Sequence, residues 1–95
     1  MSLKELLYDF SSCIAGATSA PDKYPVPEYQ NYESNKADLK DLWSQIRPRL
    51  KRDLEQAQWV DAKLQEMFAA FDAGEKEKGR DAAWALYGSD VKKLR

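Results

Sequence analysis

The sequence lacks histidine altogether and has a single cysteine, Cys13. Without imidazole, the commonest general base and the commonest metal ligand are both missing. One thiol cannot form an intramolecular disulfide or a multi-cysteine zinc or iron–sulfur site. Cys13 also has no neighbouring cation to lower its pKa, so we expect a partly buried small side chain rather than a nucleophile. The composition therefore predicts a protein that is not an enzyme and holds no metal or cofactor.

Strand-forming residues are scarce as well, because Val, Ile and Thr together number only six. β-branched residues favour strands, so this supply is too small for a sheet. Ala and Leu together supply 22 of the 95 residues, which favours helix. A chain of this length forms one small domain. We therefore predict an all-α fold, a small open bundle of three to five helices.

Long apolar runs and an excess of charge are also absent. No run approaches the ~20 residues that span a bilayer, and Glu5 and Asp9 interrupt any signal-like segment near the N-terminus. The formal net charge of −1 argues against a protein that binds nucleic acid with its whole surface. We expect a cytoplasmic protein that binds neither membrane nor a small-molecule substrate.

The N-terminal part of the chain divides into a helix and a strap. Residues 1–18 are predicted to be helical because apolar residues recur at steps of three and four, and Ser2 with Glu5 forms a capping box. Residues 19–34 combine three prolines with three tyrosines, a mixture too proline-rich for a helix. We interpret this segment as an ordered strap that lies across the helices.

Residues 35–73 carry the strongest helical periodicity, with Ser34 or Asn35 as the N-cap. Pro48 either kinks or breaks this segment, and we favour a kinked continuous helix because the apolar positions run past it without a gap. Asp61 interrupts the apolar stripe, which we expect to be core. The stripe consists of Leu50, Leu54, Ala57, Leu64, Phe68 and Phe71, with Val60 and Met67 beside it.

Residues 75–95 form a C-terminal arm that folds back on the long helix. Gly74 suits the left-handed residue that ends a helix, and Gly88 suits a second one. Residues 82–87 are apolar around nearly the whole helix, and alanines among them permit close approach of another helix. We therefore expect self-association through this arm, unless the strap covers the second face.

The most distinctive local motif is a basic cluster, which consists of Arg47, Arg49, Lys51 and Arg52. It can contact phosphates or an acidic protein partner. It can also be a solvated helix face on which Arg49 pairs with Asp53, and Lys51 with Glu55. We favour the solvated face.

Large aromatic side chains are the other candidate binding groups. Trp59 lies opposite the apolar stripe, where it either packs under the strap or is an exposed anchor. Trp84 and Tyr87 lie on the arm, and Trp and Tyr are enriched at protein interfaces. We predict a non-catalytic protein–protein interaction or regulatory module that forms a homodimer. The alternatives are a nucleic-acid-contacting protein that uses the basic cluster, and a structural subunit of a larger assembly.

Overall fold

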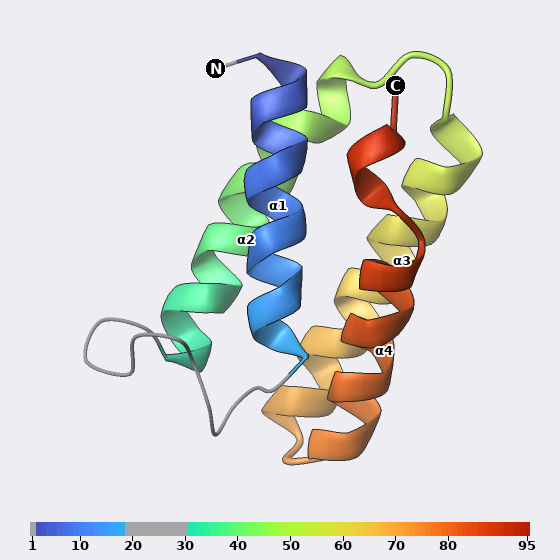
Figure 1. The fold of residues 1–95 in the computed structure, drawn as a ribbon. Helices are drawn as coiled ribbons and strands as arrows, with labels where there is room; N and C mark the ends of the chain where they lie inside the picture. Colours follow the sequence, from blue (N-terminus) through green and yellow to red (C-terminus); the bar gives the residue numbers. More distant parts are fainter. Residues whose placement is uncertain (1, 19–30) are drawn as a thin grey trace.

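The computed structural model describes residues 2–18 and 31–95, and this part of the chain is an all-α bundle without strands. The predicted small helical bundle is confirmed, and consecutive α-helices in it run in opposite directions (Figure 1). The α-helices are α1 (Leu3–Ala17), α2 (Tyr32–Ile46), α3 (Leu54–Asp72) and α4 (Lys76–Gly88). Two short 3-10 helices, η1 (Arg47–Arg49) and η2 (Val91–Lys93), follow α2 and α4.

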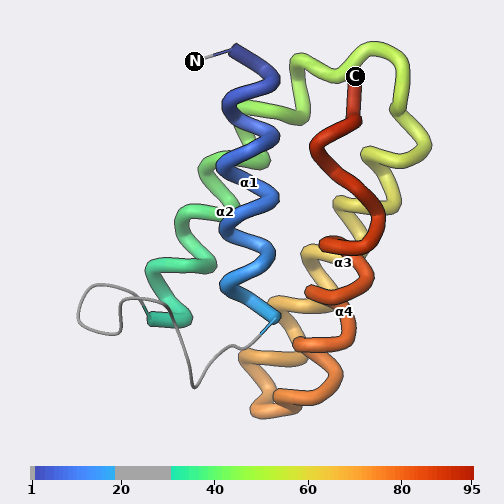
Figure 2. The backbone as a smooth tube through the Cα atoms, in the orientation of Figure 1, coloured from blue at the N-terminus to red at the C-terminus, as the bar shows by residue number. Residues whose placement is uncertain are grey.

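Three of the helix pairs pack closely: α1 with α2, α1 with α4, and α3 with α4. Figure 2 shows α1 between α2 and α4, with the tail after α4 returning beside the start of α1. Phe10 of α1 stacks on Trp43 of α2 at 5.2 Å between ring centroids. The fully buried side chains come from all four α-helices and from η2, and the largest are Phe10, Leu6, Ile14, Leu39, Ile46, Met67 and Leu86.

Polar side chains join α2 to α3 across the more open side of the bundle. Asp61 accepts hydrogen bonds from Trp43 Nε1 at 2.6 Å and from Arg47 Nε at 3.2 Å. Asp72 accepts them from Tyr32 Oη at 3.0 Å and Lys36 Nζ at 2.8 Å. The aspartate that interrupts the predicted apolar stripe is therefore the partner of a buried indole N–H, which needs an acceptor.

The predicted continuous helix over residues 35–73 is wrong, because the helix is interrupted at Pro48. Proline has no N–H to continue the α-helical pattern, and η1 ends at Leu50 in an extended conformation, with ψ 133°. Residues 51–53 are not helical, and α3 begins only at Leu54. Leu50 is buried as expected, but Leu54 is 46% exposed, since the first turn of α3 projects beyond the core.

The start of α2 also differs from the prediction. Asn31, rather than Ser34 or Asn35, is the N-cap: its side chain accepts a hydrogen bond from Ser34 N while Ser34 Oγ accepts one from Asn31 N. Residues 31–34 therefore belong to the beginning of α2 instead of the strap. The rest of the proposed strap, residues 19–30, lies outside the described residues. The predicted N-cap of α1 is confirmed, with Ser2 Oγ accepting from Glu5 N, but the Glu5 carboxylate accepts from the Ser2 hydroxyl rather than from a main-chain N–H, so the other half of the predicted capping box is not formed.

The C-terminal hairpin forms as expected around Gly74, which adopts φ +80° after α3. Gly88 is instead the last residue of α4, and the left-handed residue after this helix is Asp90, with φ +61°. No helix in the described part of the chain is both long and apolar enough to cross a membrane.

Candidate functional site

The outer face of α4 presents the two aromatic residues predicted there. Trp84 is 58% exposed and Tyr87 is 46% exposed. Their rings meet edge to face, with centroids 6.0 Å apart and planes at 81°. We call these two residues the α4 aromatic pair.

The rest of the apolar part of α4 is covered within the chain. Ala82, Ala83 and Leu86 are buried, because α3 and α1 pack on this side of the helix. The expectation that residues 82–87 leave a whole second face uncovered is therefore wrong. What stays exposed on this part of α4 is the α4 aromatic pair.

The other aromatic candidate, Trp59, is half-buried and packs against the edge of the core. Lys63 Nζ lies 6.0 Å from the centre of its ring, so a cation already faces the indole. Tyr8 of α1, which the sequence did not single out, is 64% exposed and has Lys92 Nζ 5.9 Å from its ring centre. Among residues 2–18 and 31–95, the most exposed aromatic rings thus lie on α1 and α4 rather than on α3.

The basic cluster lies at the end of the bundle where α2 turns into α3. Arg47 is half-buried and paired with Asp61, so it holds α2 to α3. The helical register that would pair Arg49 with Asp53 and Lys51 with Glu55 is lost, because residues 50–53 are not helical. Lys51 and Arg52 are exposed.

The C-terminal tail is tied to the same end by its main chain. The main-chain oxygen of Arg95 accepts hydrogen bonds from three consecutive N–H groups, those of Lys51, Arg52 and Asp53, at 3.2, 2.9 and 3.0 Å. Arg95 N donates in turn to Asp53 Oδ2 at 2.9 Å. These contacts bring the basic tail, Lys92, Lys93 and Arg95, next to the basic cluster.

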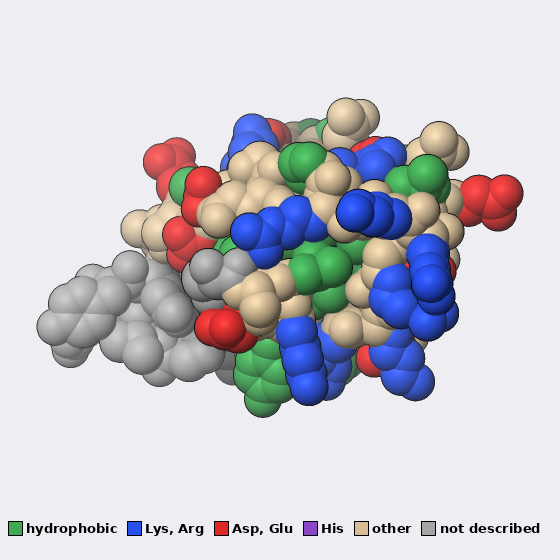
Figure 3. Space-filling view, turned by 90° about the horizontal axis from the view of Figure 1, so that it is seen from above, with side chains coloured by type: hydrophobic (Ala, Val, Ile, Leu, Met, Phe, Trp, Pro, Cys, Tyr) green, Lys and Arg blue, Asp and Glu red, His purple; other side chains and the backbone are tan. Residues whose placement is uncertain are grey.

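A hollow of about 600 Å³ opens at this end between the start of α1 and the tail. Figure 3 looks down on it and shows lysine and arginine side chains around a small apolar patch. We call it the cationic hollow, and its lining consists of Leu3, Lys4, Leu7, Lys92, Lys93, Leu94 and Arg95. In the sequence, only the basic residues of the tail indicate this hollow. Leu3 and Lys4 become part of its lining because the fold places the start of α1 beside the tail.

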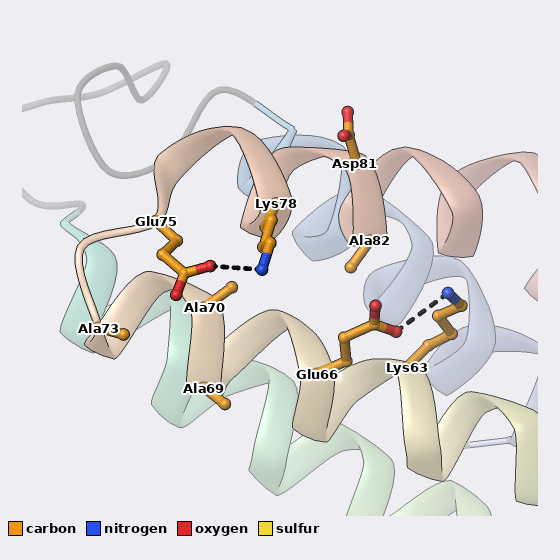
Figure 4. A pocket seen from close by; sticks show the side chains of 9 residues that line it. All are labelled: Lys63, Glu66, Ala69, Ala70, Ala73, Glu75, Lys78, Asp81 and Ala82. Atoms are coloured by element: carbon orange, nitrogen blue, oxygen red, sulfur yellow. Dashed lines mark hydrogen bonds and ion pairs between the residues drawn. The ribbon is translucent and has the colours of Figure 1, made fainter.

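A second hollow, of about 580 Å³, runs between α3 and α4 over a floor of alanines (Figure 4). Its charged side chains include two ion pairs, Lys63–Glu66 and Lys78–Glu75, each at 3.0 Å. Each of these charges is therefore neutralised by a neighbour on its own helix or turn.

Cys13 lies beside a small acidic hollow formed with Asp9, Asp38 and Asp41. Burial, together with the negative charges of Asp38 and Asp9, raises the pKa of the thiol above its ordinary value of 9.0. Since the thiolate is the reactive form, Cys13 is a poor nucleophile, as the sequence predicted. Within residues 2–18 and 31–95, no group of three or more cysteine, aspartate and glutamate side chains is arranged to hold a metal ion.

Comparison with protein-family models, with curated proteins and with solved structures finds no match to this chain.

Proposed function

We propose that this protein is a non-catalytic interaction module, and that the α4 aromatic pair is the anchor by which it binds a second copy of itself. The observation that carries the proposal is the exposure of Trp84 and Tyr87 side by side on one helix face. Trp and Tyr dominate the binding energy of protein interfaces, because each buries a large apolar area with few rotatable bonds.

The edge-to-face contact also prepares the pair for binding. Each ring restricts the other's rotamers, so less side-chain entropy is lost when a partner covers them. Gly88 lies one helical turn beyond Trp84 on the same side of α4, is exposed and has no side chain. A second helix can therefore approach α4 closely beside the rings.

A second copy is the partner we propose, because a domain of 95 residues buries a limited core. A two-fold dimer covers the same patch on both copies and so removes two aromatic pairs from water with one interface. The non-catalytic part of the proposal rests on the absence of histidine and the raised pKa of the Cys13 thiol.

Light scattering of the full chain over a wide range of concentration tests this proposal. We expect the mass of a dimer for the wild type and of a folded monomer for the double variant Trp84→Ser/Tyr87→Ser. Tyr8→Ser is the matched control, since it removes an exposed ring from α1 and should leave the dimer intact. A wild type that is monomeric at every concentration would refute self-association.

Nucleic-acid binding is the second candidate, favoured by the gathering of the basic cluster and the basic tail at one end (Figure 3). We place it second because Arg47 already pairs with Asp61 and the chain as a whole carries a net charge of −1. Binding to random-sequence DNA that weakens steeply with added salt would support it.

A further inference from the structure

The cationic hollow has an apolar floor and a positively charged rim, and a ligand that fills it must complement both. Its floor is apolar, with Leu7 and Leu94 buried and Leu3 half-buried at the opening. Its rim is formed by four cations, contributed by the start of α1 and by the tail. A ligand that fills it therefore needs an apolar group flanked by negative charge.

The rim has cations that the chain itself does not neutralise. Lys93 Nζ lies 3.2 Å from Asp90, and Arg95 Nε lies 3.9 Å from Asp53, so these two have carboxylate neighbours. Within the described part of the chain, no carboxylate lies within ion-pair distance of Lys4 or Lys92. The nearest partner of Lys92 is the ring of Tyr8. Two exposed ammonium groups at the opening thus remain for an external anion.

The basic cluster extends this charge beyond the hollow. Lys51 and Arg52 are exposed and are joined to Arg95 through the main chain. Because the molecule has a net charge of −1, positive charge gathered at one end leaves the remainder acidic. Such a charge distribution orients an anionic partner toward this end and speeds its association.

We propose that the cationic hollow binds an acidic peptide segment of a partner protein, which inserts one apolar side chain over Leu3 and places carboxylates against Lys4 and Lys92. An acidic peptide supplies both the apolar group and the flanking charges. A nucleic-acid backbone supplies only the charge, and its phosphates leave the leucine floor uncovered. This site uses residues other than the α4 aromatic pair and is independent of self-association.

Fluorescence anisotropy with the full chain tests the proposal. The probe is a fluorescein-labelled peptide in which one Phe is flanked on both sides by Asp and Glu. The comparison peptide carries Ser in place of Phe, and single-stranded oligothymidine of equal net charge represents nucleic acid. We expect the Phe peptide to bind about tenfold more tightly than the Ser peptide, since its ring is buried over the leucines.

Variants then place the site. The double variant Lys4→Gln/Lys92→Gln should bind the Phe peptide about five- to tenfold more weakly than the wild type. The matched control Lys76→Gln/Lys78→Gln removes the same charge from the exposed first turn of α4, at the opposite end of that helix, and should bind like the wild type. Circular dichroism of both variants checks whether they are folded. Trp84→Ser/Tyr87→Ser should also bind normally, which separates this site from the proposed dimer interface.

Four results would overturn the proposal. Equal affinity for the Phe and Ser peptides, or binding of neither, would show that the hollow does not take an apolar side chain. If both double lysine variants lost the same affinity for the Phe peptide, the peptide's carboxylates would bind somewhere other than Lys4 and Lys92. Tighter binding of oligothymidine than of the Phe peptide would assign this end to nucleic acid.

Discussion

Gly79 provides the sharpest test of the packing between α3 and α4, because two opposing effects meet at this position. It is buried in the second turn of α4, against the ring of Phe71 on α3. A Cβ built on Gly79 would lie 2.6 Å from two carbons of that ring. The ring itself is buried and packs on Tyr32, with centroids 5.3 Å apart, so it has little room to move.

The sign of Gly79→Ala depends on which effect is larger. Replacing glycine by alanine inside a helix stabilises by about 1 kcal/mol. Forcing a methyl group into a packed contact costs about 1–3 kcal/mol. Gly88→Ala, at the last residue of the same helix, is the matched control, since a Cβ there meets nothing within 4 Å. We expect the free energy of unfolding of Gly79→Ala to fall below that of Gly88→Ala by about 1–3 kcal/mol.

Urea denaturation followed by circular dichroism measures both variants against the wild type. A difference of 1 kcal/mol corresponds to a shift in Tm of about 4–8 °C for a domain of this size, so thermal melts provide a second readout. Adding Phe71→Leu to Gly79→Ala should recover part of the loss, because the smaller side chain leaves space for the methyl group. If Gly79→Ala is as stable as Gly88→Ala, the close approach of α4 to Phe71 is wrong.

Three further substitutions or treatments test separate parts of the fold. Phe68→Ala should cost about 3–5 kcal/mol in a urea melt, since the ring is core; a loss below about 1 kcal/mol would contradict its burial. Alkylation of Cys13 by iodoacetamide at mildly alkaline pH should be slower in the folded chain than in urea, because its raised pKa suppresses the thiolate; equal rates would contradict this. Hydrogen bonds from Lys36 and Tyr32 hold the pKa of Asp72 below its usual 3.8. Its stabilising contribution is therefore complete above about pH 4 and lost as the pH falls further, so the deficit of Asp72→Asn in Tm should shrink in acid; a constant deficit would contradict the ion pair.

The periodicity of apolar residues predicted the helices well, and it failed at their boundaries. Steps of three and four place Leu39, Trp43, Ile46 and Leu50 on one line whether the helix continues or turns, so the break at Pro48 left no trace in the pattern. Pro48 ends the α-helical hydrogen bonding, and a distant contact then holds the following residues out of the helix: the N–H groups of residues 51–53 donate to the main-chain oxygen of Arg95. A contact between residues so far apart in the sequence cannot be read from local periodicity.

The candidate surfaces were predictable to different degrees. Trp84 and Tyr87 were predicted from residue type alone, because Trp and Tyr are enriched at protein interfaces. Their exposure to solvent could be established only from the structure. The cationic hollow was missed because its rim joins Lys4 to Lys92, residues at opposite ends of the chain. Asp61 was recognised only as a gap in the apolar stripe, and its role became clear once Trp43 and Arg47 were seen to bind it.

Photocrosslinking from position 84 tests the central claim, that the α4 aromatic pair contacts a second copy of the chain, most directly. Trp84 is replaced by p-benzoylphenylalanine, which keeps an aromatic side chain at the anchor, and the same residue is placed at Tyr8 as the control. We predict covalent dimers from position 84, crosslinked to α4 of the second copy, and a much lower yield from position 8. Exclusively monomeric product from position 84, or equal yields from the two positions, would contradict the proposed interface.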